Sequence, residues 1–282
     1  MRKPYREFKP AELIEKAKKL KAHMGLEGID FFSFNFNMYS DFYKLLWELS
    51  SIFSRVSLKS QRFDMLAAEP EMVEYQSAAG KTIYSCGLEG ISARLRRFLN
   101  KNLDVRTLNQ SIELMMKAQA RELKIFLLSC GMEEDGDFEE FSIFTEQVMQ
   151  AKRRFNSRAR VIFSVTPLVK FPWTPLEFDD AYPAEKHEAV ISAMKKIAEA
   201  NKCEFRQAMD VGEYLISQIL VRSTPQIQNA LLKTLEDTGF VYYRGITQKF
   251  ISALIANLKR EGISPDELLK GFSLKESEEK PW

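Results

Sequence analysis

Apolar positions along the chain alternate between the spacing of strands and the spacing of helices. Short runs rich in Ile, Val, Phe and Leu predict strands, and they cover residues 29–37, 55–61, 82–87, 123–130 and 159–167. Stretches with apolar residues three and four positions apart predict helices between them, at residues 10–22, 41–53, 69–79, 91–99, 105–118 and 138–155. Five repeats of strand and helix predict parallel strands joined by right-handed crossovers.

The pattern changes after residue 178. Residues 183–271 show almost only helical spacing, in the stretches 184–201, 211–221, 225–237, 247–261 and 265–269. We therefore predict an α/β protein, with residues 1–178 forming a partial, TIM-like (β/α) barrel of parallel strands. Residues 179–282 are expected to form a helical extension packed on that barrel.

Composition narrows the class of protein. The 282 residues have 45% hydrophobic content and a net charge of +2, which gives no general reason to expect nucleic acid or a membrane surface as a partner. No apolar run reaches the ~20 residues that a membrane-spanning helix needs. Three widely spaced cysteines argue against a disulfide framework. We expect a cytoplasmic protein that binds a small molecule.

Polar residues alternate with aromatic ones in the first predicted strand. Ser33, Asn35 and Asn37 share one parity, and Phe32, Phe34 and Phe36 share the other. The aromatic set is expected under the helices and the polar set inside the barrel, where it favours a liganded or hydrated cavity. An edge strand with a wet face explains the alternation equally well. Ser60 and Arg62 repeat this mixture in the next strand.

Two turns close apolar runs at expected strand ends. In Cys86-Gly-Leu-Glu-Gly-Ile-Ser92 the glycines permit a sharp turn into a helix, Glu89 can accept a hydrogen bond from an amine, and the helix start suits a carboxylate. Together these features suit an amino-acid zwitterion. A tight turn with Ser92 as the helix N-cap is the competing interpretation. In Phe171-Pro-Trp-Thr-Pro-Leu176, Trp173 is more often a packing anchor than a stacking platform.

The order of these segments resembles the radical S-adenosylmethionine (radical SAM) superfamily. Gly87-Leu-Glu-Gly-Ile-Ser92 followed by Leu99-Asn-Lys101 is similar to the family's fourth-strand turn. Leu127-Leu-Ser-Cys-Gly131 with Glu134 and Asp137 looks like its fifth-strand segment, and residues 166–176 resemble its sixth. The resemblance covers residues 1–178. It is closest in kind to uncharacterised members that also carry a cobalamin-binding domain.

That resemblance implies a ligand and its contacts. Glu89 and Ser92 would contact the aminocarboxylate end of S-adenosylmethionine, and backbone near Val169 would meet its adenine. Ser33 and Asn35 would contact the sugar or the methionine end, and Ser60 and Arg62 complete the expected cofactor-binding set. The family's [4Fe–4S] cluster is expected only in a longer parent protein, where cobalamin is possible too.

The chain departs from the family at several points: the family's first strand is missing, and Met132-Glu133 replace the Pro-Gly of its fifth-strand segment. It contains no Cys-x-x-x-Cys-x-x-Cys, and Cys86 and Cys130 lie too far apart to replace that triplet of cluster ligands. We therefore expect the core fragment or split product of a radical SAM enzyme, unable to form the cluster alone. A missing N-terminal segment or a partner chain would carry the cluster. The alternative is a cluster-free barrel that binds a ligand or a protein without catalysis.

Overall fold

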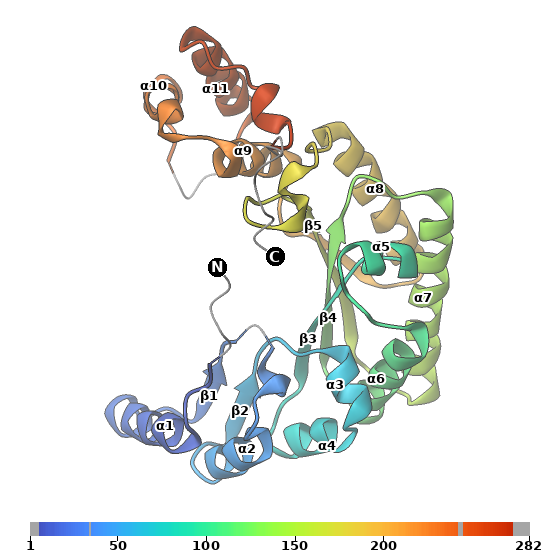
Figure 1. Cartoon of the computed structure of the whole chain (residues 1–282). Helices are drawn as coiled ribbons and strands as arrows, with labels where there is room; N and C mark the ends of the chain where they lie inside the picture. Colours follow the sequence, from blue (N-terminus) through green and yellow to red (C-terminus); the bar gives the residue numbers. More distant parts are fainter. Residues whose placement is uncertain (1–5, 34, 242–244, 273–282) are drawn as a thin grey trace, which may run out of the picture.

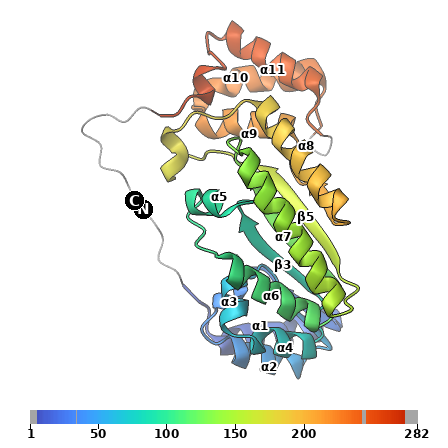
Figure 2. The ribbon, with the colours of Figure 1, turned by 90° about the vertical axis from the view of Figure 1, so that its right-hand side faces the viewer.

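Strands line the inside of an open arc, and helices cover its outside. The computed structural model describes residues 6–33, 35–241 and 245–272. In Figure 1 the arc opens to the left, between the first helices and strands at the bottom and the last helices at the top. Figure 2 looks at the outer side, where long helices run across the strands. This arrangement confirms the predicted partial (β/α) barrel.

All the strands of the arc are parallel to their neighbours. The first sheet has the order β1-β2 and the second β3-β4-β5-β6. The strands are β1 (Gly28–Phe31), β2 (Arg55–Leu58), β3 (Ile83–Glu89), β4 (Glu122–Ser129), β5 (Arg160–Pro167) and β6 (Glu204–Gln207). Because the strands follow one another in chain order, each crossover helix packs on the outer face, and all the carboxyl ends lie at one rim.

The helices of the arc form its outer layer. They are α1 (Pro10–Met24), α2 (Phe42–Ser50), α3 (Phe63–Ala68), α4 (Glu71–Ala78), α5 (Ala93–Phe98), α6 (Val105–Lys117), α7 (Asp135–Arg154) and α8 (Ala184–Ala200), with a 3₁₀ turn η1 (Phe36–Met38) after β1. The core lies between this layer and the sheets. Ile125 and Leu127 of β4 face it, as does Phe163 of β5, which meets Phe141 of α7 edge to face at 5.2 Å. The alternate residues of each strand therefore face the concave side.

One strand lies in the stretch that was expected to be almost wholly helical. β6 pairs with β5 from Ile162↔Glu204 to Val165↔Gln207. Its sequence, Glu-Phe-Arg-Gln, has one apolar residue, so it gives no periodic signal, and its strand state depends on backbone pairing with β5. The alternation of strand and helix thus continues past residue 178. The division into domains at that residue stays a prediction.

The last helices gather round an apolar cluster of their own. α9 (Val211–Arg222), α10 (Gln228–Thr238) and α11 (Gln248–Arg260) are joined by the 3₁₀ turn η3 (Pro225–Ile227) and followed by η4 (Glu267–Leu269). Ile219 and Leu254 lie in this second cluster. Buried Arg222 ties it to the barrel by donating to the carbonyl oxygens of Leu269 at 2.8 Å and Asp179 at 2.6 Å. Over the described residues, no helix is long and apolar enough to cross a membrane.

Side chains rather than a strand ladder join the two sheets. One parallel bridge, Gln61↔Cys86, links the end of β2 to β3. The carbonyl oxygen of Leu58 accepts from buried Lys81 Nζ at 2.8 Å and from Gln61 Nε2 at 3.2 Å, and Gln61 and Gln76 exchange hydrogen bonds through their amides. Burial lowers the pKa of Lys81 to about 8. We call Gln61, Gln76 and Lys81 the seam.

Candidate functional site

The turn after β3 presents one carboxylate to the concave side. A bulge between Gly87 and Glu89 shifts the register with β4, and Glu89 adopts a left-handed backbone with φ 66°. The carboxylate lies over Gly87, because a Cβ added there would meet Glu89 Oε1 at 2.1 Å. Lys101 Nζ approaches the same oxygen at 3.7 Å. Burial raises the pKa of Glu89, and the nearby ammonium group of Lys101 offsets part of this rise.

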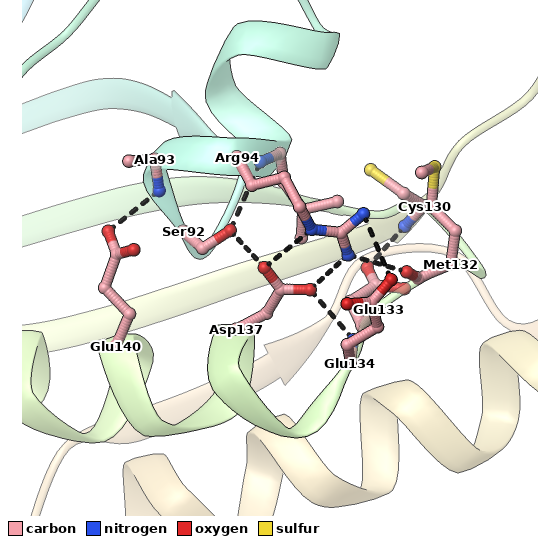
Figure 3. Close-up of polar contacts among 10 residues, drawn as sticks. Ser92, Ala93, Arg94, Cys130, Met132, Glu133, Glu134, Asp137 and Glu140 are labelled. Carbon is pink, nitrogen blue, oxygen red and sulfur yellow. Dashed lines mark hydrogen bonds and ion pairs between the residues drawn. The ribbon is translucent and has the colours of Figure 1, made fainter.

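Ser92 has a structural role at the start of α5. Its hydroxyl accepts a hydrogen bond from Leu95 N at 3.2 Å and donates to Asp137 Oδ1, and Ala93 N donates to Glu140 Oε1 at 2.8 Å (Figure 3). The structure thus shows the N-cap of the competing interpretation. At Ala93 and Leu95, the amide groups expected to meet a ligand carboxylate are already occupied. A ligand contact by buried Ser92 stays a prediction.

Asp137 connects the turn after β3 with the turn after β4. Arg94 donates to both oxygens of its carboxylate and also to the carbonyl oxygen of Met132 at 2.9 Å (Figure 3). Asp137 accepts from Glu134 N as well, at 2.8 Å, within a capping box at the start of α7. Burial raises the pKa of Asp137, but the bonds from Arg94 and Ser92 outweigh it and leave that pKa lowered. Glu134 and Asp137 thus cap the start of α7 together.

The polar residues after β1 and β2 serve a different purpose from the one expected. β1 ends at Phe31, because Phe36 N donates to Ser60 O at 2.8 Å and Asn37 exchanges two hydrogen bonds with the backbone of Arg62. Asn37 is therefore buried in a protein contact. Phe32 was expected under the helices, but it is 81% exposed; Phe36 is buried. Phe34 lies outside the described residues.

The four predicted ligand contacts in this region lie near the carboxyl ends of β1 and β2. Ser33 is exposed and Asn35 half-buried. Ser60 has φ 56°, and Arg62 is held by the carboxylate of Asp64 at 2.9 and 2.6 Å, which raises its pKa. Because Gln61 bridges to Cys86, Ser60 and Arg62 approach the end of β3 in space. Ligand binding by all four stays a prediction.

The segment after β5 carries a strained and exposed aromatic residue. Val169 is buried, and the backbone of the next residue, Lys170, exchanges two hydrogen bonds with the amide of Gln218 at 2.8 and 3.1 Å. Trp173 is 79% exposed with φ 62°, and its backbone N–H donates to Glu177. Trp173 is therefore no packing anchor, contrary to the more common case. The predicted contact between adenine and backbone near Val169 is not tested by this geometry.

Sequence reasoning missed a buried histidine beneath the strand ends. His187 is 1% exposed; its Nδ1 lies 3.0 Å from Ser129 Oγ, and its ring meets that of Tyr214 at 4.4 Å. Burial lowers its pKa to about 4, so the ring is neutral at pH 7. Val190, Ile191 and Met194 follow it at spacings of three, four and seven. That pattern places His187 on the buried face of α8 and could have revealed it.

The three cysteines do not form a cluster site. All are buried, at separate places in the fold: on β3, at the end of β4 and just before β6. Burial raises the pKa of the Cys86 thiol to about 12 and of the Cys203 thiol to about 11, and it raises that of Cys130 as well. Over the described residues, no group of three or more His, Cys, Asp or Glu could hold a metal ion. This donor set does not fit a [4Fe–4S] cluster.

Comparison with known families identifies the barrel. The model of the radical SAM superfamily matches residues 1–144, which is just over half of the chain and includes β1 to β4. The chain belongs to the radical SAM superfamily. No curated protein matches it. Radical SAM membership implies S-adenosylmethionine and usually a [4Fe–4S] cluster as cofactors. The matched region contains Glu89, Ser92 and Asp137, whereas β5 and Val169 lie beyond it.

Proposed function

We propose that this chain is the barrel core of a radical SAM enzyme and binds S-adenosylmethionine at the carboxyl ends of its strands. One observation carries the proposal, namely the Glu89 carboxylate on the concave side of the turn after β3. A backbone bulge and a left-handed conformation hold it there. Non-glycine residues with such strain cluster at ligand sites.

The charge around Glu89 suits the amino group of the ligand. Among the described residues its ion-pair partner is Lys101, at 3.7 Å, which is too long for a strong hydrogen bond. A ligand ammonium group can therefore approach the carboxylate and form the charge-assisted hydrogen bond that Lys101 does not complete. The lowered solvent exposure at this turn strengthens such a bond. The roles of Ser33, Asn35, Ser92 and Val169 toward the same ligand follow from the family resemblance, and those of Ser60 and Arg62 from the polar alternation of their strand.

Cluster ligands must come from outside the described residues, since the buried thiols do not fit. β1 pairs with β2 on one side, and across the described residues its other edge has no strand partner. Such an edge can take a further parallel strand. We infer that a preceding segment or a partner chain adds this strand and brings the thiolates, in a longer parent that could also hold cobalamin. Cytoplasmic location and the expected absence of nucleic-acid and membrane partners stay predictions.

Calorimetric titration with S-adenosylmethionine and S-adenosylhomocysteine tests the ligand. Wild type should bind both weakly. Glu89→Ala and Glu89→Gln should weaken binding roughly tenfold or more, since a hydrogen bond to a charged group is worth about 1.5–3 kcal/mol. Glu113→Gln, which removes an acid paired with Arg154 on the outer surface, is the control. Equal binding by wild type and both Glu89 variants would reject the site.

Anaerobic reconstitution with iron and sulfide tests the competing function, a barrel that binds without catalysis. The isolated chain should take up no stoichiometric cluster, because its three buried thiols have raised pKa values and lie apart. Adding the preceding genomic segment or a co-expressed partner with a Cys-x-x-x-Cys-x-x-Cys should restore the cluster. If no such partner restores it while S-adenosylmethionine still binds, the non-catalytic alternative is favoured.

A further inference from the structure

A row of side chains crosses the concave face of the second sheet. In the strand register Gly87 pairs with Phe126, Phe126 with Ser164, and Ser164 with Arg206. These residues lie on the face opposite the helices, since their strand neighbours Ile125 and Phe163 are in the core. The Glu89 carboxylate covers Gly87 at one end of the row. The row thus begins at the proposed cofactor site and ends at Arg206.

Phe126 is an exposed aromatic ring in the middle of this row. Side chains usually fill the interior of a parallel barrel, yet Phe126 is 37% exposed. Its neighbour in the row, Ser164, is small and buried, so no large side chain from β5 competes for the ring. Lys124, two residues earlier on the same face, holds its Nζ 4.8 Å from the ring centroid. The ammonium group of Lys124 covers part of one face of the ring, and the exposed remainder of the ring offers a flat apolar surface.

The charges near this ring do not balance. Arg160 binds the Glu204 carboxylate at 2.8 and 2.7 Å and approaches Glu122 at 3.2 Å, so both acids are already paired. Lys124 and Arg206 form no ion pair with an acid within the part of the chain that the structure describes. Glu89 and Lys101 at the start of the row pair with each other. Counting them, three acids and four bases leave an excess of one positive charge on this part of the face.

We propose that this row is a subsite for an organic anion with a planar apolar body. The ring of the ligand would lie on Phe126, and its carboxylate or phosphate would meet Lys124 and Arg206. Arg206 lies three strand spacings from Gly87, about 14 Å, which is too far for one amino-acid group to reach from Glu89. The anion is therefore a molecule separate from S-adenosylmethionine. Resting on the proposed function, this subsite names the substrate class as planar organic anions.

Ligand-observed NMR titration without S-adenosylmethionine tests the subsite. The probes are naphthalene-2-carboxylate, the uncharged 2-naphthalenemethanol and the cationic 2-naphthylmethylamine. Half-buried Lys124 and exposed Arg206 should together favour the carboxylate over the alcohol by about tenfold. Arg206→Ala should reduce that preference to about threefold, and Phe126→Ala should weaken carboxylate and alcohol alike. Arg153→Ala, an exposed arginine on the outer helix α7, should change nothing.

Several outcomes separate this inference from the cofactor proposal. Glu89→Ala should weaken binding of S-adenosylmethionine roughly tenfold or more. It should leave the carboxylate probe bound at least as tightly, because a nearby negative charge is removed. Carboxylate binding without any cofactor binding would reject the cofactor proposal alone. Equal affinity for all three probes, or equal losses in Arg153→Ala and Arg206→Ala, would overturn the subsite. A dimer that dissociates in Phe126→Ala would overturn it too, since a second copy would then cover the face.

Discussion

The turn after β3 is held by its neighbours, whereas the tip of the loop after β5, at Phe171, Trp173 and Thr174, is held by residues of the same loop. Ser92 and Arg94 both bond Asp137 at the start of the next long helix, α7. In the loop after β5, Trp173 N donates to Glu177 four residues on, and Thr174 Oγ1 donates to Phe171 O at 2.7 Å. The turn after β3 shares its hydrogen bonds with another part of the sheet's rim. In the loop after β5 only the tip closes on its own residues, because Lys170 bonds Gln218 and Glu177 O accepts from Phe272 N.

The two segments also expose different side chains. The externally held turn leaves one acid, Glu89, facing the concave side, whereas the loop leaves Phe171 and Trp173 in solvent. Both contain a left-handed residue that is not glycine, Glu89 in one and Trp173 in the other. A strand end alone therefore does not mark a binding group. A binding group is better recognised as a side chain that has no strong hydrogen bond of its own, in a turn whose backbone is held by hydrogen bonds to other parts of the fold.

Gly90→Ala should have the largest effect, because the turn after β3 has no room for a side chain there. A Cβ would meet Arg96 N at 2.5 Å and Leu95 C at 2.6 Å, and this backbone cannot move without breaking α5. We expect the free energy of unfolding to fall by about 3 kcal/mol in urea denaturation. Gly136→Ala on α7, where the Cβ would meet nothing within 4 Å, should instead be neutral or slightly stabilising. Equal effects would contradict the difference in crowding.

Asp137→Ala should cost about 2 kcal/mol of stability at pH 7, because it leaves Ser92 buried without its acceptor and Arg94 without its main partner. The lowered pKa of Asp137 means that its contribution is present above the unfolded-state pKa near 3.8 and is lost as the pH falls through the folded-state value. Unfolding measured at pH 7 and at pH 3 should therefore show the gap between variant and wild type narrowing in acid. A constant gap would mean that Asp137 acts without its charge.

Gly87→Ala should weaken cofactor binding more than it weakens the fold. Its Cβ would meet only the end of the Glu89 side chain, at 2.1 Å, and the tip of Lys101 at 3.6 Å, and flexible side chains can move away. We expect roughly tenfold weaker binding of S-adenosylmethionine in calorimetry, with a stability change below about 1 kcal/mol. Unfolding as severe as that of Gly90→Ala would show that both glycines serve the turn alone.

Trp173→Gly should have the smallest effect and the opposite sign. Glycine relieves the left-handed strain at φ 62°, and little buried area is lost because the side chain is already in solvent. Greater freedom of the unfolded chain offsets part of this gain, so we expect about 0.5 kcal/mol of stabilisation in thermal unfolding. Trp173→Ala keeps the Cβ and should show no gain. Stabilisation by both variants would point to relief of something other than backbone strain.

The strands that the sequence predicted best are long apolar runs with polar turns on both sides. β4 and β5 were predicted to within one residue at each end, because long apolar runs of Leu, Ile and Val are bounded by polar turns. The sharp turn at Gly90 into a helix capped by Ser92 was placed correctly, whereas Gly87 lies within β3, paired with Phe126. The position of the Glu89 side chain was predictable only as a strand end, since nothing local encodes the bulge and left-handed backbone that aim it.

Other features depend on partners distant in sequence. β6 is a strand because it pairs with the edge of β5. The strand expected to reach Asn37 ends early, because Phe36 and Asn37 hydrogen-bond to the backbone of Ser60 and Arg62 instead. The bond between Ser92 and Asp137 joins residues 45 positions apart. Local periodicity indicates which residues are buried, but it does not indicate which residues distant in sequence they will contact.

The seam gives the arc a compliant joint. Between β3 and β6 neighbouring strands are fastened by ladders of backbone hydrogen bonds, but β2 meets β3 through one bridge and the side chains of Gln61, Gln76 and Lys81. Spreading the arc there strains a few rotatable side chains and two backbone hydrogen bonds, from Gln61 N to Ser85 O at 3.0 Å and from Val56 N to Ala79 O at 3.2 Å, and leaves the ladders intact. Ser60 and Arg62 lie on one side of this joint and Glu89 on the other. A ligand that contacts residues on both sides of this joint would therefore fix the distance between β2 and β3, and with it the width of the barrel.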